Sequence, residues 1–122
     1  MLKRSRLTRK TPLKRTKYGN KITFYSGRLF DSGKEARYAQ ELDLRRHLAN
    51  PMERVVSWQG QVKIPLRVND KLICNYYADF KVRFADGRDE YHEVKGLATD
   101  VWRIKEKLFR ALYPNITLKV IR

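Results

Sequence analysis

The sequence predicts a mixed α/β fold over residues 23–122, preceded by a basic arm over residues 1–22. A helix with start and stop signals comes first, and alternating strands follow it with connections too short for parallel crossovers. A second helix precedes the last apolar stretch, so that the final strand can pair parallel to the earlier ones. The predicted order is helix, three or four antiparallel strands, helix and strand, in a single domain without repeats.

Positive charge dominates the composition. The 122 residues include 28 Lys or Arg against 13 Asp or Glu, a net charge of +15. This excess indicates a polyanionic partner, most simply nucleic acid. Residues 1–30 contain ten Lys or Arg and no acid, which predicts an arm that orders on phosphates and grips the backbone without reading sequence. Its predicted DNA-binding residues are Lys3, Arg4, Arg6, Arg9, Lys10, Lys14, Arg15 and Lys17.

The first helix is predicted within residues 28–51. Ser32 and Glu35 form a capping-box pattern, and Pro51 ends the segment. At 100° per residue, Glu35 also lies on the apolar face of this helix. Two interpretations of Glu35 therefore stand, a helix cap or a carboxylate that points inward. The apolar residues of the other face, which offer a second contact such as a dimer, are Leu44 and Leu48.

Four strands are predicted after this helix. Period-2 alternation marks them, and turn signals separate them at residues 68–70 and 85–87. Pro65 favours an edge position or a bulge, because proline cannot donate to a neighbouring strand. The strands form an antiparallel meander. Their predicted ranges are 52–58, 62–68, 72–84 and 90–96.

The second helix is predicted from about residue 99 to residue 113, and residues 115–122 form the last strand. Lys105 lies at the centre of the apolar stripe of this helix. Its ammonium group either reaches past its neighbours to water or contacts an anion such as a carboxylate or a phosphate. The stripe consists of Val101, Trp102, Ile104, Leu108, Phe109 and Leu112.

Three charged residues on two predicted strands form the candidate site. Glu93 and Lys95 share a face, and the turn at 85–87 brings Asp79 close to Glu93. Two such carboxylates repel each other unless a cation lies between them, and magnesium prefers hard oxygen ligands. The main-chain carbonyl of Val94 offers a further oxygen, and Lys95 is suited to activating water or stabilising charge on phosphorus. This set is sufficient for phosphodiester hydrolysis.

These residues carry a family resemblance. "YYADF" followed by "YHEVKG" resembles the PD-(D/E)xK nuclease signature, with Ala78 where that signature has proline. Glu35 in "DSGKEARYA" is similar to the additional acid on the first helix of many such enzymes. "TDVWRIKEKLFRALYP" resembles the following helix in a small phage-associated branch, which is similar to endonuclease I-type Holliday-junction resolvases. The likeness covers about residues 24–121.

The resemblance implies a restriction-endonuclease-like αβββαβ core with a mixed central sheet flanked by helices. It also implies a metal-dependent DNA endonuclease acting on branched DNA such as Holliday junctions, in phage recombination or DNA processing. Glu35, Asp79, Glu93 and Lys95 would be catalytic. Mg²⁺, with Mn²⁺ as a substitute, would be held by Asp79, Glu93, the Val94 carbonyl and Glu35. Lys105 would contact DNA, and cutting two strands would require a homodimer.

A non-catalytic basic nucleic-acid-binding protein is the alternative, because the net charge fits both functions. The sequence has no apolar run near the roughly 20 residues of a membrane span and no secretory signal, so we expect no membrane partner. Cys74 is the only cysteine, which excludes an intrachain disulfide. We expect a cytoplasmic protein, or one of the host cytoplasm if phage-encoded.

Overall fold

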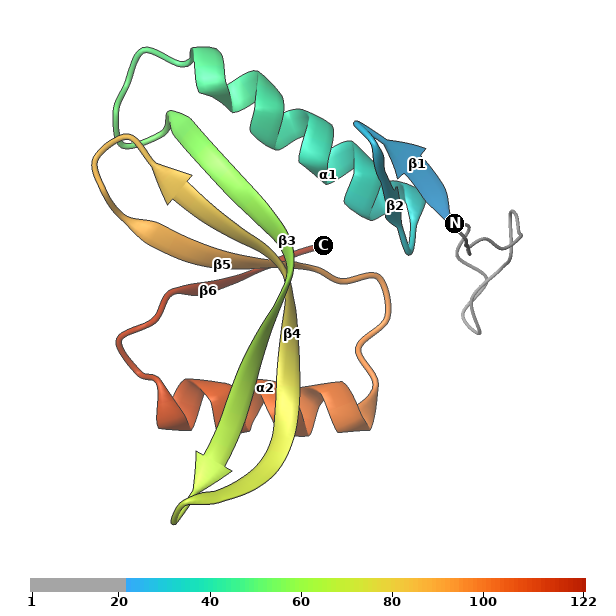
Figure 1. The fold of residues 1–122 in the computed structure, drawn as a ribbon, viewed down its shortest axis with the longest axis vertical. Coiled ribbons are helices and arrows are strands. Elements are labelled where there is room, and N and C mark those ends of the chain that lie inside the picture. The colour runs from blue at the N-terminus through green and yellow to red at the C-terminus, as the bar shows by residue number, and fades with distance from the viewer. Residues whose placement is uncertain (1–21) are drawn as a thin grey trace, which may run out of the picture. The chain divides into compact units, whose positions relative to one another are not determined.

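A computed structural model describes residues 22–122 of the chain (Figure 1). The arm residues predicted to bind DNA lie outside the described residues. The chain divides into two compact units, Met1–Ala39 and Gln40–Arg122, and each is described by itself. Asp79, Glu93 and Lys95 belong to the second unit, and Glu35 belongs to the first.

The first unit contains a short hairpin that the sequence interpretation missed. Strands β1 (Thr23–Tyr25) and β2 (Arg28–Phe30) pair antiparallel. Ser26 and Gly27 connect them with φ values of 51° and 79°, and two successive residues with positive φ make a two-residue hairpin turn. Residues 28–30, which the sequence analysis included in the segment of the first helix, therefore form a strand. The Ser-Gly dipeptide was the available turn signal.

Helix α1 (Gly33–Leu44) begins where the capping pattern predicted. The Ser32 hydroxyl accepts a hydrogen bond from the main-chain N–H of Glu35 at 3.1 Å, which satisfies one free donor of the first turn. The helix gives way to a 3₁₀ turn at Arg45–His47, so it ends earlier than Pro51. Leu42 is fully buried, and Leu44 is exposed as expected for the opposite face.

The second unit contains a mixed four-stranded sheet in the order β3-β4-β5-β6. The first three strands are antiparallel, and β6 pairs parallel with β5, as the intervening helix predicted. With the two α-helices of the described residues, this is a mixed α/β fold. The strands are β3 (Val55–Val68), β4 (Lys71–Phe84), β5 (Asp89–Val94) and β6 (Leu118–Ile121).

Strand β3 is one strand of 14 residues where the sequence predicted two. Gln61 lies at its centre with a left-handed φ of 52°, yet Gly60 and Val62 on either side stay paired with β4. Residues 51–53 form a turn, and the strand begins only at Val55. β3 is an edge strand, which explains how it accommodates Pro65.

Helix α2 (Asp100–Leu112) packs on the half of the β3–β4 hairpin nearest the hairpin turn (Figure 1). Thr99 caps it by accepting from the Trp102 N–H at 3.1 Å. Phe109 is fully buried and stacks on Tyr76 with ring centroids 5.1 Å apart.

The predicted apolar stripe of α2 is wrong at Val101 and Ile104, which are 63% and 66% exposed. Trp102 and Phe109 of the helix pack against the sheet. The contact involves fewer residues of α2 than the predicted stripe contains. Lys105 is half-buried, in line with its place at the centre of the stripe. Within residues 22–122, no helix is long and apolar enough to cross a membrane.

Candidate active site

Asp79 and Glu93 lie side by side on neighbouring strands. The β4–β5 register ends at the pair of Phe80 and His92, and Asp79 and Glu93 are the next residues along the two strands. Asp79 is 8% exposed and Glu93 is 4% exposed. The count outward from the turn at 85–87 predicted this neighbourhood. Two buried carboxylates in such a position require positive charge or protonation.

Asp79 is held by two hydrogen bonds. Its Oδ2 accepts from the Val94 main-chain N–H at 2.8 Å, and its Oδ1 accepts from Gln61 Nε2 at 3.3 Å. Left-handed backbone at a non-glycine residue costs about 1–2 kcal/mol. Gln61, the residue of β3 with left-handed backbone, is thus also the residue whose side-chain amide bonds to Asp79. No sequence signal gave Gln61 this role, because it fell between two predicted strands.

Glu93 contacts one hydroxyl and one cation. Its Oε1 accepts from the Tyr76 hydroxyl at 3.2 Å, and its Oε2 lies 3.6 Å from Lys95 Nζ. Lys95 Nζ also lies 4.8 Å from the centroid of the Trp102 ring on α2. The predicted pairing of Glu93 with Lys95 on one face is therefore confirmed.

The surroundings of Glu93 disfavour its ionised form. Burial, and after it the charge of Asp79, raise the pKa of Glu93 to about 8. Burial and the charge of Glu93 also raise the pKa of Tyr76. A carboxylate with so high a pKa, next to a second carboxylate, is typical of a functional site. One additional cation between the two acids would relieve the repulsion between their charges.

Tyr76 was not predicted at the site. Alternation along β4 puts Tyr77, and not Tyr76, on the side of the strand that Asp79 occupies. The structure stacks Tyr76 on Phe109, which brings its hydroxyl to Glu93. Tyr77 is 52% exposed. The contact depends on how α2 packs, which the pattern within one strand does not contain.

The remaining predicted residues are placed as follows. Glu35 is half-buried in the first unit, so its predicted share in a metal site stays a prediction. Val94 meets Asp79 through its N–H, and the predicted role of its carbonyl stays a prediction. Within residues 22–122, no group of three or more His, Cys, Asp or Glu side chains is placed to bind a metal ion.

The opposite face of β5 carries a second buried acid, Glu90. Its Oε1 lies 2.9 Å from His92 Nε2 and 3.4 Å from Lys119 Nζ, and its Oε2 lies 3.4 Å from Arg88 Nε. Burial alone would raise the pKa of Glu90, but the His92 hydrogen bond and the cations lower it. Burial lowers the pKa of His92. These opposite charges lie in contact, which is typical of a structural ion cluster.

The comparison with protein families identifies one match. A model described as a protein of unknown function, DUF1064, matches residues 15–122, and the chain therefore belongs to the DUF1064 family. Neither a curated protein nor a solved structure matches the chain.

Proposed function

We propose that this DUF1064 protein is a metal-dependent DNA endonuclease with a restriction-endonuclease-like core. The observation that carries the proposal is the pair of buried carboxylates, Asp79 and Glu93, with Lys95 Nζ 3.6 Å from the second. The order of Asp79, Glu93 and Lys95 along the chain also supports it, because that order resembles the PD-(D/E)xK signature.

The residues fit a divalent cation on the chemistry of their donors. Mg²⁺ and Mn²⁺ take hard oxygen ligands, and Asp79 and Glu93 offer two adjacent carboxylates whose repulsion a cation would relieve. The Val94 carbonyl and Glu35 complete the proposed set. When bound, the ion supplies Lewis-acid polarisation of the phosphate and a water of lowered pKa.

The side chains around the acids have distinct proposed roles. Lys95 positions the attacking water or stabilises the charge that develops on the phosphate. The Val94 N–H and the Gln61 amide fix the orientation of Asp79, and the Tyr76 hydroxyl fixes that of Glu93. Such supporting hydrogen bonds keep ligand oxygens in position.

DNA is the proposed substrate because the chain carries a net charge of +15. Branched DNA, such as a Holliday junction in phage recombination or DNA processing, follows from the resemblance. We also propose a homodimer, because cutting two strands needs two sites. Lys105 on α2 and the arm over residues 1–22 would contact the phosphate backbone.

A cleavage assay tests the proposal. Wild type, Asp79→Asn and Lys95→Ala are incubated with a four-way junction, duplex DNA and single-stranded DNA, each with Mg²⁺, Mn²⁺ or EDTA. We expect wild type to cut with either metal and not with EDTA, and both variants to lose cutting while keeping binding. Wild type that binds all three DNAs and cuts none would favour the non-catalytic nucleic-acid-binding protein. Equal cutting by Asp79→Asn would overturn the site assignment.

The role of the arm has a separate test. Deletion of residues 1–21 should make the slope of log affinity against log salt concentration less steep, because fewer phosphates lose their counterions on binding. An unchanged slope would mean that the arm does not bind DNA.

A further inference from the structure

The outward face of the β3–β4 hairpin includes Asp79 and extends along both strands to either side of it. Side chains alternate along a strand, and the inward row of β4 is buried at Tyr76, Ala78, Phe80 and Val82. Asp79 therefore lies within the outward row, with Gln61 of β3 beside it. Each strand is 14 residues long, so the outward face extends well beyond the site in both directions.

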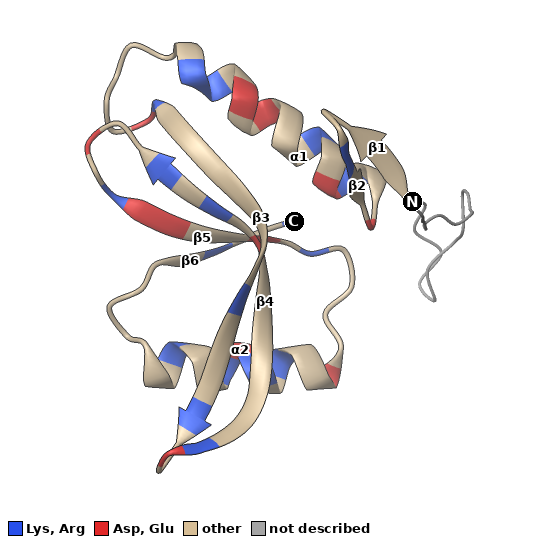
Figure 2. Ribbon diagram, viewed as in Figure 1, with Lys and Arg blue, Asp and Glu red and all other residues tan. Residues whose placement is uncertain are grey.

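Cations flank the site along this face. Lys81 is two residues from Asp79 on β4, and Lys63 is two residues from Gln61 on β3, toward the hairpin turn. Two residues along a strand span about 6.6 Å. Figure 2 shows basic positions on both halves of the hairpin. Apart from Asp79, this row holds no acid between the two irregularities of the β3–β4 register; its members there are Ser57, Gln59, Gln61, Lys63, Pro65, Asn75, Tyr77, Asp79, Lys81 and Arg83.

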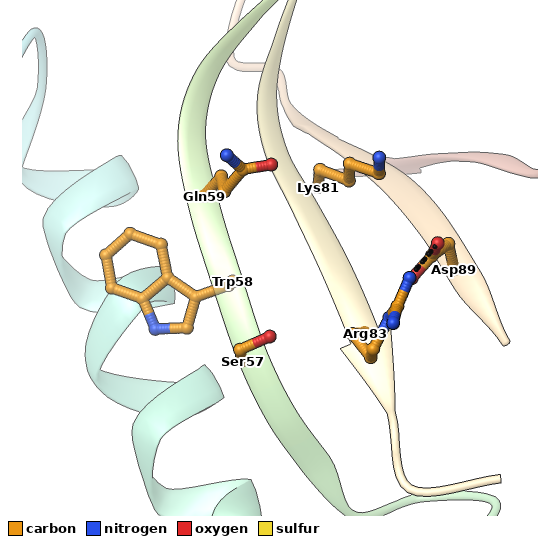
Figure 3. Close-up of a pocket in the computed structure, with 6 residues that line it drawn as sticks. All are labelled: Ser57, Trp58, Gln59, Lys81, Arg83 and Asp89. Atoms are coloured by element: carbon orange, nitrogen blue, oxygen red, sulfur yellow. Dashed lines mark hydrogen bonds and ion pairs between the residues drawn. The ribbon is translucent and has the colours of Figure 1, made fainter. Parts of the chain in front are cut away.

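A hollow of about 160 Å³ lies on the Lys81 side of the site (Figure 3). Ser57, Trp58 and Gln59 line it from β3, and the Trp58 Nε1 donates to Asp43 Oδ1 at 2.8 Å. Arg83 is engaged by Asp89 through two hydrogen bonds of 2.8 and 2.9 Å. Lys81 Nζ lies 5.8 Å from the centroid of the Tyr91 ring. A cation with neighbouring hydroxyl and amide groups is suited to a phosphate oxygen.

The other side of the site combines a cation with an exposed ring. Lys63 is directly opposite Tyr77 in the register, and Tyr77 is 52% exposed. An exposed aromatic ring beside a basic side chain is the combination that holds single-stranded nucleic acid, because a base stacks on the ring while its phosphate meets the cation.

We propose that one DNA strand lies along the outward face of the β3–β4 hairpin and crosses the candidate site at Asp79. Lys81, with Gln59 and Ser57, binds a phosphate on one side of the scissile phosphate. Lys63 binds a phosphate on the other side, and a base stacks on Tyr77. The proposal rests on the proposed function, since it takes the carboxylate pair as the place of cutting.

Salt-dependent binding tests the two lysines. The full chain carrying Asp79→Asn is the reference, since it is expected to bind without cutting. Lys63→Ala and Lys81→Ala are each added to it, with the exposed α2 residue Lys107 changed to Ala as the matched control. Affinity for fluorescein-labelled single-stranded DNA is measured against salt concentration. Each hairpin variant should lower the slope of log affinity against log salt by about 0.7, the loss of one phosphate contact.

The outcomes separate the strand path from the function. A less steep slope in the Lys63→Ala and Lys81→Ala variants, with no change in the Lys107→Ala variant, supports the path. This holds even if wild type never cuts DNA with Mg²⁺. Slopes equal to that of the Lys107 variant overturn the path, even if wild type cuts.

Tyr77 provides an independent measurement. In the same Asp79→Asn background, Tyr77→Ala should weaken binding of single-stranded DNA by at least about fivefold, while Tyr77→Phe keeps the ring and the affinity. Equal affinities of the Tyr77→Ala variant and its reference would overturn stacking at this position.

Discussion

Strand β5 carries two buried glutamates, three residues apart on opposite faces, whose surroundings differ in kind. Glu90 is contacted by His92, Lys119 and Arg88, and these groups lower its pKa. Glu93 lies beside a second carboxylate, and burial together with that charge raises its pKa to about 8. Glu90 is stabilised in its ionised form, and Glu93 is destabilised in that form.

The difference is the one expected between a structural acid and a functional one. A buried charge surrounded by partners contributes to a defined fold. A buried carboxylate beside another carboxylate weakens the fold, and such local conflicts concentrate where function requires them. Burial alone would not have distinguished the two, since Glu90 and Glu93 are each 4% exposed.

The largest expected difference between the two acids is in cleavage. Glu93→Gln should lower the rate of cutting by about 1,000-fold, because it removes a carboxylate of the proposed metal site. Glu90→Gln should keep the rate within about threefold at a temperature well below its melting point. Initial rates on the best-cut DNA of the cleavage assay measure both. A folded Glu90→Gln protein that cuts as poorly as Glu93→Gln would place the other face of β5 in the reaction.

The next effect is the stability of the metal-free protein. The raised pKa of Glu93 means that the folded state binds one more proton than the unfolded state between pH 4.5 and about pH 8. Stability due to this group is therefore full below pH 4.5 and falls as the pH rises to about 8, by on the order of a few kcal/mol. Glu93→Gln removes that loss, so its melting temperature in EDTA should exceed that of wild type by more at pH 8 than at pH 5.

Added Mg²⁺ is the control for this prediction. At pH 8 it should raise the melting temperature of wild type and narrow the gap, because a ligand that binds the folded state stabilises it. A difference in melting temperature between Glu93→Gln and wild type that does not change with pH would contradict the raised pKa of Glu93.

Glu90→Gln should act in the opposite direction. At pH 7 it should reduce the free energy of unfolding by about 1–3 kcal/mol, since Arg88 and Lys119 lose their carboxylate. The pKa of Glu90 is lowered, so its contribution is present above its ordinary value of 4.5 and is lost as the pH falls through the folded-state value. Urea unfolding at several pH values should show the two proteins converging in acid. A constant difference down to pH 2 would contradict the ion cluster.

The sequence predicted what depends on local geometry. Alternation put Glu93 and Lys95 on one face, and the short turn brought Asp79 to them, because both follow from the period of a strand. Tyr76 and the Glu90 cluster were missed because they depend on contacts between distant segments. Tyr76 is set by the packing of Phe109 from α2, and Lys119 reaches Glu90 only through the parallel pairing of β6.

Gln61 is the residue that sequence reasoning had least means to find, and it gives the smallest expected effect. In a strand, glycine is normally less stable than alanine by about 0.5–1 kcal/mol. At φ 52° the order should reverse, because only alanine keeps the left-handed strain. Gln61→Gly should therefore be more stable than Gln61→Ala by about 1 kcal/mol, measured by urea unfolding. Both variants remove the hydrogen bond to Asp79, so both should cut DNA more slowly than wild type by a similar factor. Gln61→Ala as stable as Gln61→Gly would show that no strain is held there, and unchanged cutting in both would show that Asp79 keeps its orientation through Val94 alone.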